Sequence, residues 1–220
     1  MAGKRTYGDR CGVARALDLL GDRWALLVVR ELLLGPKRFT DLRAGLPNVG
    51  PDVLAQRLRE LEQVGVVRRD TLPPPAASHV YELTVWGGEL EPIVLALGRW
   101  RSRAPFPPGD ARIGVDAAVI ALKTLFEPAA ADRLNATYEL RFGDQRFVAR
   151  VAEGRLAIAR GGASVPDSMI ATDPGTLSAV LWHGRRLRDA ERAGEIEIQG
   201  SRSAVRRFLG LFPLPEPAPA

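Results

Sequence analysis

The sequence predicts a chain with two parts, a mainly α-helical N-terminal half and an α+β C-terminal half. Up to residue 101, apolar residues recur mostly at helical spacing, interrupted by one pair of short strand-like stretches. Beyond residue 135, stretches that alternate apolar and polar residues are mixed with apolar helical segments. Between these two patterns, residues 103–110 contain three prolines and one glycine, which cannot continue a helix.

This break in composition predicts two domains joined by a linker. We place the domains at residues 1–104 and 111–212, with a proline-rich linker at 105–110 and a proline-rich tail at 213–220. The first domain holds 16 Lys and Arg against 12 Asp and Glu, so it carries +4 of the chain's net charge of +5. A surplus of this size is only a weak indication of a polyanionic partner. The positions of the basic residues must decide whether the chain has such a partner.

The composition excludes several classes of protein. A chain of 220 residues with 46% hydrophobic and 26% charged residues is typical of a globular protein rather than a disordered one. The single cysteine cannot form an internal disulfide, and with only two histidines we expect neither a metal site nor a cofactor. The longest apolar runs, 24–29 and 117–122, are too short to span a bilayer, and no secretory signal is recognisable, so we expect a cytoplasmic protein.

The N-terminal half begins with two predicted helices. Apolar residues at helical spacing predict the first over 13–20. Asp22 is expected to cap the second, a very apolar helix over 23–34 that ends at a Gly-Pro pair.

Two more helices joined by a tight turn follow. The first is short, over 38–43, with Thr40 as its expected N-cap, and the turn at 45–50 leads to a longer helix that starts at Pro51. In this longer helix one stripe is apolar and the opposite face is polar, consisting of Asp52, Gln56, Arg59 and Gln63. Such a pair of helices places polar side chains in the major groove of DNA, where Gln and Arg match the edges of adenine and guanine.

A β-hairpin is predicted next, with strands over 66–72 and 80–84 and a loop over 73–79, followed by a last helix over 88–101. A hairpin in this position is a wing that can contact the DNA backbone. The residues that we expect to contact DNA are Arg38, Thr40, Asn48, Asp52, Gln56, Arg57, Arg59, Arg68, Arg69, Ser78 and His79. The alternative for the helix residues is a charged, solvated face without a partner.

Spaced blocks in this half strongly resemble the HxlR family of winged-helix transcriptional regulators. The blocks include residues 11–24, Arg30-Glu31-Leu32, Arg38-Phe39, Gln56-Arg57-Leu58, Gly65-Val66-Val67 and Tyr81-Glu82-Leu83-Thr84. The resemblance covers about residues 10–101 and implies a MarR-like winged helix-turn-helix fold. It also implies a homodimer that binds a pseudo-palindromic operator in double-stranded DNA. Gly50 and Gly12 depart from the family pattern, which has a Ser cap and a Pro at these positions.

The resemblance implies that the first and last helices pair in the dimer. The apolar residues that would form this interface are Leu17, Leu20, Leu90, Ile93, Val94, Leu97 and Trp100. The alternative is that this apolar stripe packs against its own domain. In some family members a cysteine at the position of Cys11 resembles a thiol sensor, and the alternative is a small residue without such a role.

The C-terminal half is predicted to be an α+β domain with helices on one face of a small sheet. Helices are expected over 115–125, 173–183 and 201–211, and strands over 136–142, 146–151, 155–159 and 196–198. The segments 170–181, 194–200 and 205–209 resemble the sterol carrier protein family, over about residues 110–212.

This second resemblance implies a cavity for an apolar, lipid-like effector between the sheet and the helices. The candidate lining residues are Leu140, Phe142, Phe147, Leu177, Leu181, Trp182, Phe208 and Leu211. The alternative is that these residues only fill a solid core.

Neither histidine has a nucleophile at motif spacing, and the chain has no glycine-rich phosphate loop, so we expect no enzyme activity. Two functions remain open at this point. The first is a DNA-binding transcriptional regulator with an apolar effector. The second is a carrier of hydrophobic ligands whose N-terminal domain serves mainly for dimerisation.

Overall fold

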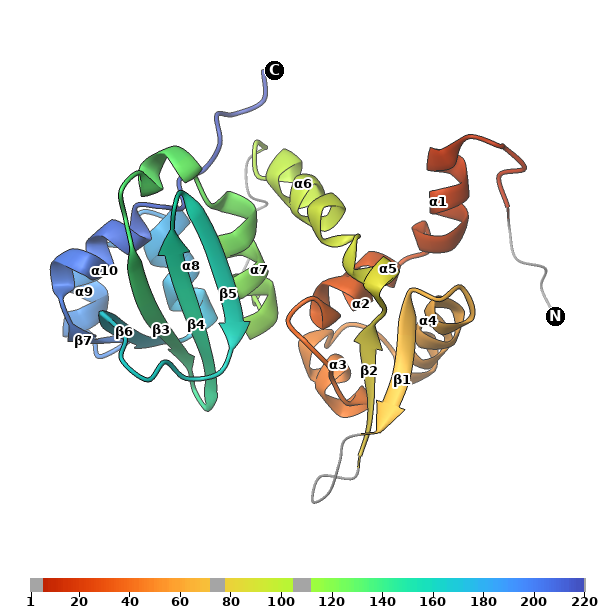
Figure 1. The fold of residues 1–220 in the computed structure, drawn as a ribbon, viewed down its shortest axis with the longest axis horizontal. Helices are drawn as coiled ribbons and strands as arrows, with labels where there is room; N and C mark the ends of the chain where they lie inside the picture. The colour runs from red at the N-terminus through yellow and green to blue at the C-terminus, as the bar shows by residue number, and fades with distance from the viewer. Residues whose placement is uncertain (1–5, 72–77, 105–111, 220) are drawn as a thin grey trace. The chain divides into compact units, whose positions relative to one another are not determined.

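The computed structural model describes residues 6–71, 78–104 and 112–219 (Figure 1). The chain forms two compact units, Met1–Val94 and Leu95–Ala220, which are called here the N-terminal and C-terminal units. The division between them falls inside one helix, α6 (Glu91–Arg101). The predicted linker at 105–110 lies outside the described residues.

The N-terminal unit is mainly helical, as predicted, and contains a two-stranded hairpin. Its elements before α6 are α1 (Gly12–Leu20), α2 (Ala25–Leu32), α3 (Phe39–Gly45), α4 (Pro51–Gln63), β1 (Val67–Thr71), β2 (His79–Leu83) and α5 (Val85–Gly88). The order of α3, α4 and the hairpin is that of a winged helix-turn-helix.

The core of this unit lies between α2, α3 and α4. Leu54, Leu58 and Leu61 of α4 are 0–1% exposed, as their helical spacing predicts. They pack with Leu42 of α3 and with a group of buried residues that includes Val28 of α2. Burial of each such leucine contributes roughly 1.5–3 kcal/mol, so this stripe fixes the rotation of α4 about its own axis and leaves the opposite face in solvent.

The start of α2 differs from the prediction. The helix begins at Ala25, and its N-cap residue is Trp24, whose φ of 80° lies in the left-handed region. Asp22 therefore does not cap the helix, and its carboxylate instead pairs with Arg57 of α4. The left-handed backbone is unfavourable for a bulky residue, and the Trp24 side chain is retained there by packing against the core.

Two other predicted helix boundaries are also wrong. Thr40 lies inside α3, whose N-cap residue is Arg38; the Asp41 carboxylate accepts a hydrogen bond from the Arg38 backbone N–H at 3.2 Å. The predicted helix over 88–101 begins only at residue 91, as α6. Gly88 is instead the last residue of a short α5, which Thr84 caps by accepting a hydrogen bond from the Gly87 N–H at 3.0 Å.

Gly87 allows α5 to lie directly against the chain that enters β1. A Cβ atom at this position would lie 2.0 Å from the carbonyl oxygen of Val66, whereas one at the adjacent Gly88 would meet nothing within 4 Å. The close approach therefore depends on the absence of a side chain at residue 87.

The hairpin is antiparallel, with Val67 opposite Leu83 and Thr71 opposite His79. Lys37, which lies just before α3, forms a β-bridge with Tyr81 of β2 through two backbone hydrogen bonds of 2.8 and 2.9 Å. This bridge attaches the wing to the helix-turn-helix.

The C-terminal unit is a five-stranded sheet with helices on one face, in agreement with the predicted α+β class. Its elements are α7 (Val115–Leu125), η1 (Pro128–Ala131), β3 (Ala136–Phe142), β4 (Gln145–Ala152), β5 (Arg155–Arg160), β6 (Ser168–Thr172), α8 (Pro174–Trp182), α9 (Leu187–Arg192), β7 (Ile196–Gly200) and α10 (Arg202–Leu209). The strand order is β5-β4-β3-β6-β7, and only the pair β3–β6 is parallel. The predicted strands and helices are present, and β6 and α9 were not predicted.

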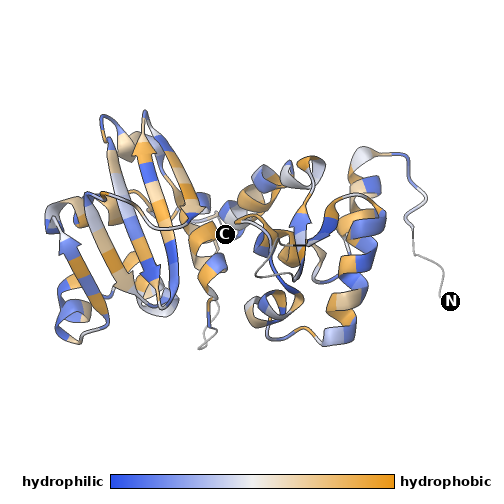
Figure 2. Cartoon of the chain, turned by 60° about the horizontal axis from the view of Figure 1, so that its bottom comes forward, coloured by the Kyte–Doolittle hydropathy of each residue, from blue (hydrophilic) through white to orange (hydrophobic). Residues whose placement is uncertain are grey.

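Side chains alternate between the two faces of this sheet. On the helix-covered face, the Tyr138 hydroxyl donates a hydrogen bond to the Ala204 carbonyl of α10 at 3.2 Å, and its ring lies 4.5 Å from that of Phe208. The other face of β3, β4 and β5 has no helix of this unit over it among the described residues (Figure 1), and Figure 2 shows hydrophilic residues interspersed with hydrophobic ones along these strands. In the part of the chain that the structure describes, no helix is long and apolar enough to cross a membrane.

Candidate nucleic-acid interface

The exposed face of α4 presents the polar residues that were predicted to read DNA. Asp52, Gln56 and Arg59 are exposed, while the leucine stripe on the opposite face is buried. The helix begins with Pro51 at its first position after Gly50, which adopts extended backbone and provides no side-chain cap.

Gln56 and Arg59 are connected on this face. One Arg59 guanidinium nitrogen donates to the Gln56 side-chain oxygen at 2.8 Å, and the Gln56 amide donates to the Glu60 carboxylate at 2.6 Å. Because both groups are solvent-exposed, these hydrogen bonds can be exchanged for bonds to a base or a phosphate. Both residues offer paired hydrogen-bonding groups of the kind that discriminate between bases in the major groove.

Arg57 is separated from this face. Its side chain is 17% exposed, and its guanidinium pairs with Asp22, which precedes α2, and with Glu60. The structure thus places Arg57 against the rest of the unit, where it connects α4 to the α1–α2 junction. Sequence analysis included it among the DNA contacts because the residue type alone does not reveal a partner 35 positions away.

The remaining predicted DNA contacts lie on α3, the turn and the wing. Arg38, Thr40 and Asn48 are exposed. On the wing, Arg68 pairs with Glu82 of the opposite strand at 2.7 Å, and the Arg69 guanidinium lies 6.0 Å from the centre of the Tyr81 ring.

At the tip of the wing, the imidazole of exposed His79 is 3.1 Å from the Thr71 hydroxyl. Ser78 is half-buried. Residues 72–77, which include most of the predicted wing loop, lie outside the described residues. The structure brings the exposed members of the predicted set onto α3, the turn, α4 and the hairpin.

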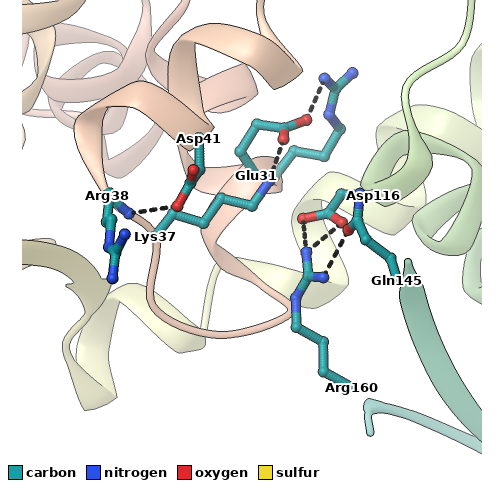
Figure 3. Close-up of polar contacts among 8 residues, drawn as sticks. Glu31, Lys37, Arg38, Asp41, Asp116, Gln145 and Arg160 are labelled. Atoms are coloured by element: carbon teal, nitrogen blue, oxygen red, sulfur yellow. Dashed lines mark hydrogen bonds and ion pairs between the residues drawn. The ribbon is translucent and has the colours of Figure 1, made fainter. Parts of the chain in front are cut away.

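A buried ion-pair network beneath this surface was missed by sequence analysis. Glu31 of α2 is 1% exposed, and its carboxylate accepts hydrogen bonds from Lys37 at 2.6 Å and from Arg30 at 2.7 Å (Figure 3). A Cβ atom on Gly45, the last residue of α3, would lie 2.1 Å from the Glu31 carboxylate. The network therefore fixes the distance between α2 and the end of α3. The sequence signal was the pair of charged residues, Arg30 and Glu31, near the end of a mainly apolar helix.

The predicted dimer residues fall into two groups. Leu20, Leu90 and Val94 are partly buried and pack against the core of the N-terminal unit. The exposed group is Leu17 at 44%, Ile93 at 51%, Leu97 at 46% and Trp100 at 70%. α1 has no buried residue, and Cys11 is exposed at its N-terminus.

In the C-terminal unit the predicted cavity residues come from the helix-covered face of the sheet, from α8 and from the end of α10. Six of them are buried, and Leu181 and Trp182 are partly buried. The rings of Phe142 and Phe147 are 6.1 Å apart, and the Trp182 indole N–H donates to the Phe212 carbonyl at 3.0 Å. An open hollow of about 430 Å³ on this unit is lined by other residues, namely Ala130, Asp132, Arg133, Leu134, Arg207 and Gly210.

Two buried carboxylates stabilise this unit. Asp116 in the first turn of α7 is 3% exposed, and its carboxylate accepts a hydrogen bond from Arg160 of β5 at 2.6 Å (Figure 3). Arg160 also donates to the Gln145 side chain at 2.8 Å and lies 4.9 Å from the centre of the Phe147 ring. A hydrogen bond from Arg141 holds the pKa of the Glu139 carboxyl below its ordinary value, against the opposing effect of burial.

Comparison with known proteins identifies the N-terminal half. Residues 19–105 match the family described as HxlR-like helix-turn-helix. The uncharacterised regulator YvaP of Bacillus subtilis is 43% identical over 86 residues, which are 39% of this chain and 80% of YvaP. The transcriptional regulator YodB of the same organism is 37% identical over 95 residues, 43% of this chain and 84% of YodB.

Solved structures match the same half of the chain. The structure of the reduced form of B. subtilis YodB shows 35% identity and a TM-score of 0.40, covering 46% of this chain and 100% of YodB. The structure of the redox regulator HypR in its oxidised form shows 34% identity and a TM-score of 0.40, covering 44% of this chain and 100% of HypR.

Proposed function

Because the chain belongs to the HxlR-like helix-turn-helix family of transcriptional regulators, we propose that it is a homodimer that reads a pseudo-palindromic operator through α4. The observation that carries this proposal is the orientation of α4. Its leucine stripe is buried in the core, and Gln56 and Arg59 therefore face solvent on the side opposite that stripe. The wing follows directly, with Arg68 and Arg69 exposed on its first strand.

Selection of DNA fragments from a random pool by the purified protein tests this function. We expect enrichment of a sequence with two related half-sites about one helical turn, or a multiple of it, apart. The variant Gln56→Ala/Arg59→Ala should lose roughly thirtyfold or more in preference for this sequence over a mismatched one, since each of the two paired base contacts contributes about 1–3 kcal/mol of discrimination.

A matched control is Gln63→Ala, which truncates an exposed polar side chain at the far end of the same helix. It should bind the selected DNA as the unmodified protein does. If the double variant keeps full discrimination, the face assigned to base recognition is wrong. If no sequence is enriched, the regulator function itself fails for this chain.

The proposed homodimer is supported by exposed apolar residues on two helices. Val13 and Leu17 of α1 are 68% and 44% exposed, and Ile93 and Trp100 of α6 are 51% and 70% exposed. Large apolar side chains in neighbouring turns of a helix mark interaction sites when they remain in solvent. A two-fold dimer formed through these helices would present two copies of α4 to the two half-sites.

The second element of the proposal is that the C-terminal unit is sterol carrier protein-like and takes an apolar, lipid-like effector. Its support is the arrangement of a small sheet with apolar residues, including Leu140, Phe147 and Leu177, beneath helices on one face only. Because the aromatic rings there pack against one another, a ligand would have to displace them.

The competing function, a ligand carrier that only dimerises through its N-terminal unit, is distinguished by salt. A regulator with phosphate contacts loses DNA affinity steeply as salt rises. A carrier without DNA contacts shows no DNA affinity at any salt concentration.

A further inference from the structure

The helix-free face of β3, β4 and β5 carries a group of arginines. Phe147 and Arg160 mark the helix-covered side, since Arg160 pairs with Asp116 of α7 and lies over the Phe147 ring. Alternation along the strands places the arginines at 141, 146, 150 and 155 on the other side. These four residues are named here the arginine face, and Arg146, Arg150 and Arg155 are exposed.

Like charges lie directly opposite each other on this face. Arg141 of β3 is the cross-strand partner of Arg146 of β4, and a like-charged pair in this arrangement lowers the stability of a sheet. Glu139, which is 2% exposed, accepts a hydrogen bond of 2.5 Å from Arg141, and the positive charge of Arg146 also acts on its carboxylate. Its second carboxylate oxygen accepts the Ala163 backbone N–H at 2.9 Å.

Among residues 6–71, 78–104 and 112–219, no carboxylate forms a close ion pair with Arg146, Arg150 or Arg155, although the charge of Arg146 does help to lower the pKa of the Glu139 carboxyl. Glu139 lies opposite Val148 of β4, and the other acidic residues near these strands, Asp144 and Glu153, lie in the turns at the strand ends. Elsewhere on the same unit, exposed arginines do find carboxylates. Arg202 pairs with Glu191 at 3.2 Å, and Arg185 pairs with Glu195.

The side chains between these arginines on β4 and β5 are aliphatic, and the half-buried Val148 lies between Arg146 and Arg150. Ala157 of β5 is the cross-strand partner of Arg150, and Ala152 is the partner of Arg155. Arg146 and Arg150 are four residues apart on one strand, about 13 Å at the rise of a β-strand. A face of this length with spaced cations is complementary to an extended polyanion rather than to a small enclosed ligand.

We propose that the arginine face binds the phosphate backbone of DNA beside the operator, an inference that rests on the proposed function. When α4 is bound to a half-site of the operator, the covalent connection keeps the C-terminal unit at a high effective concentration near the flanking DNA. Individually weak phosphate contacts then add to affinity. Because phosphates carry no sequence information, this face contributes affinity and leaves sequence preference to α4.

The test uses the full-length protein and two duplexes that contain the DNA sequence it selects. One duplex ends at the outer edges of the two half-sites, and the other extends beyond them on both sides. Affinity is measured over a series of salt concentrations. In the variant Arg146→Ala/Arg150→Ala/Arg155→Ala, the slope of log K against log salt on the extended duplex should become shallower by about one for each phosphate that the protein no longer neutralises. On the trimmed duplex the change should be smaller.

The matched control is Arg186→Ala/Arg188→Ala/Arg206→Ala, which removes the same charge from exposed residues at α9 and α10. This control should keep the slope of the unmodified protein on both duplexes. Thermal unfolding followed by circular dichroism establishes that both variants fold.

Two failures are distinguishable. If the unmodified protein selects no DNA, the proposed function fails and this inference fails with it. If the protein binds its selected DNA but the face variant and the control share one slope on the extended duplex, only the inference is overturned. The arginine face would then be assigned to an acidic protein partner.

Discussion

Buried charges at single residues determine how the N-terminal unit is held together. Glu31 sits 1% exposed between α2 and the end of α3, with Lys37 and Arg30 as its partners. Removing one partner of a buried pair leaves an uncompensated charge, which is more costly than never burying the pair. The network thus makes the spacing of the helix-turn-helix dependent on one carboxylate.

We expect Glu31→Ala to lower the free energy of unfolding by about 3–5 kcal/mol. Lys37→Met should cost less, because Glu31 keeps its hydrogen bond from Arg30. Urea unfolding monitored by circular dichroism measures both, with the exposed Glu62→Ala as the control. Equal stability of Glu31→Ala and the control would show that the network contributes nothing.

The contact between Asp22 and Arg57 connects α4 to the residues that precede α2. Since the Asp22 side chain is 61% exposed, we expect a coupling of only about 0.2–1 kcal/mol in a double-mutant cycle with Asp22→Ala and Arg57→Ala. Asp22→Ala should weaken binding to the selected DNA several-fold, although Asp22 does not lie on the polar face of α4. Unchanged affinity in Asp22→Ala would reduce the ion pair to a local contact.

At the scale of elements, α4 was predictable because its helical signals agree with its packing. A proline at the first position and a leucine stripe of helical period define both its start and its buried side. Gln56 and Arg59 follow from that stripe by geometry. The orientation of Arg57 does not, because it depends on Asp22 in a different element.

Elements whose partners are distant were the ones that sequence analysis missed. β6 is five residues long and pairs in parallel with β3, about thirty positions earlier in the chain. α9 has only six residues. Such short segments carry too few residues for a period to be recognised. The start of α2 was predicted wrongly for a related reason. Local backbone preference disfavours the left-handed conformation of Trp24, and packing of its side chain against the core stabilises it.

The exposed apolar residues of α1 and α6 lead to a prediction for these two helices. The variant Leu17→Glu/Ile93→Glu should sediment with the mass of one chain, because it places charges in the proposed dimer interface. Val165→Glu, an exposed site in the C-terminal unit at 87%, should keep the mass of the unmodified protein. A double variant that still sediments as a dimer would show that another surface joins the two copies.

At the scale of the whole molecule, the proposal joins DNA binding in one unit to ligand binding in the other. A ligand changes DNA affinity only if it binds the two states of the protein with different affinity. We therefore expect an effective acyl or polyketide-like compound to shift the affinity for the selected DNA by about 5- to 150-fold, the usual range of coupling. Titration of such compounds into a DNA-binding assay measures this, and Phe147→Ala should alter the response. Constant affinity across all compounds would leave the C-terminal unit without a sensing role.

The close approach of α5 to the chain entering β1 has a consequence for which changes this sequence can accumulate. Adjacent glycines at 87 and 88 should differ sharply in mutational tolerance, because only at the first would a methyl group lie 2.0 Å from a backbone oxygen. In a library of single substitutions selected for DNA binding, alanine should be depleted at residue 87 and retained at residue 88. Equal survival of alanine at both positions would mean that α5 can shift away from the Val66 carbonyl without loss of function.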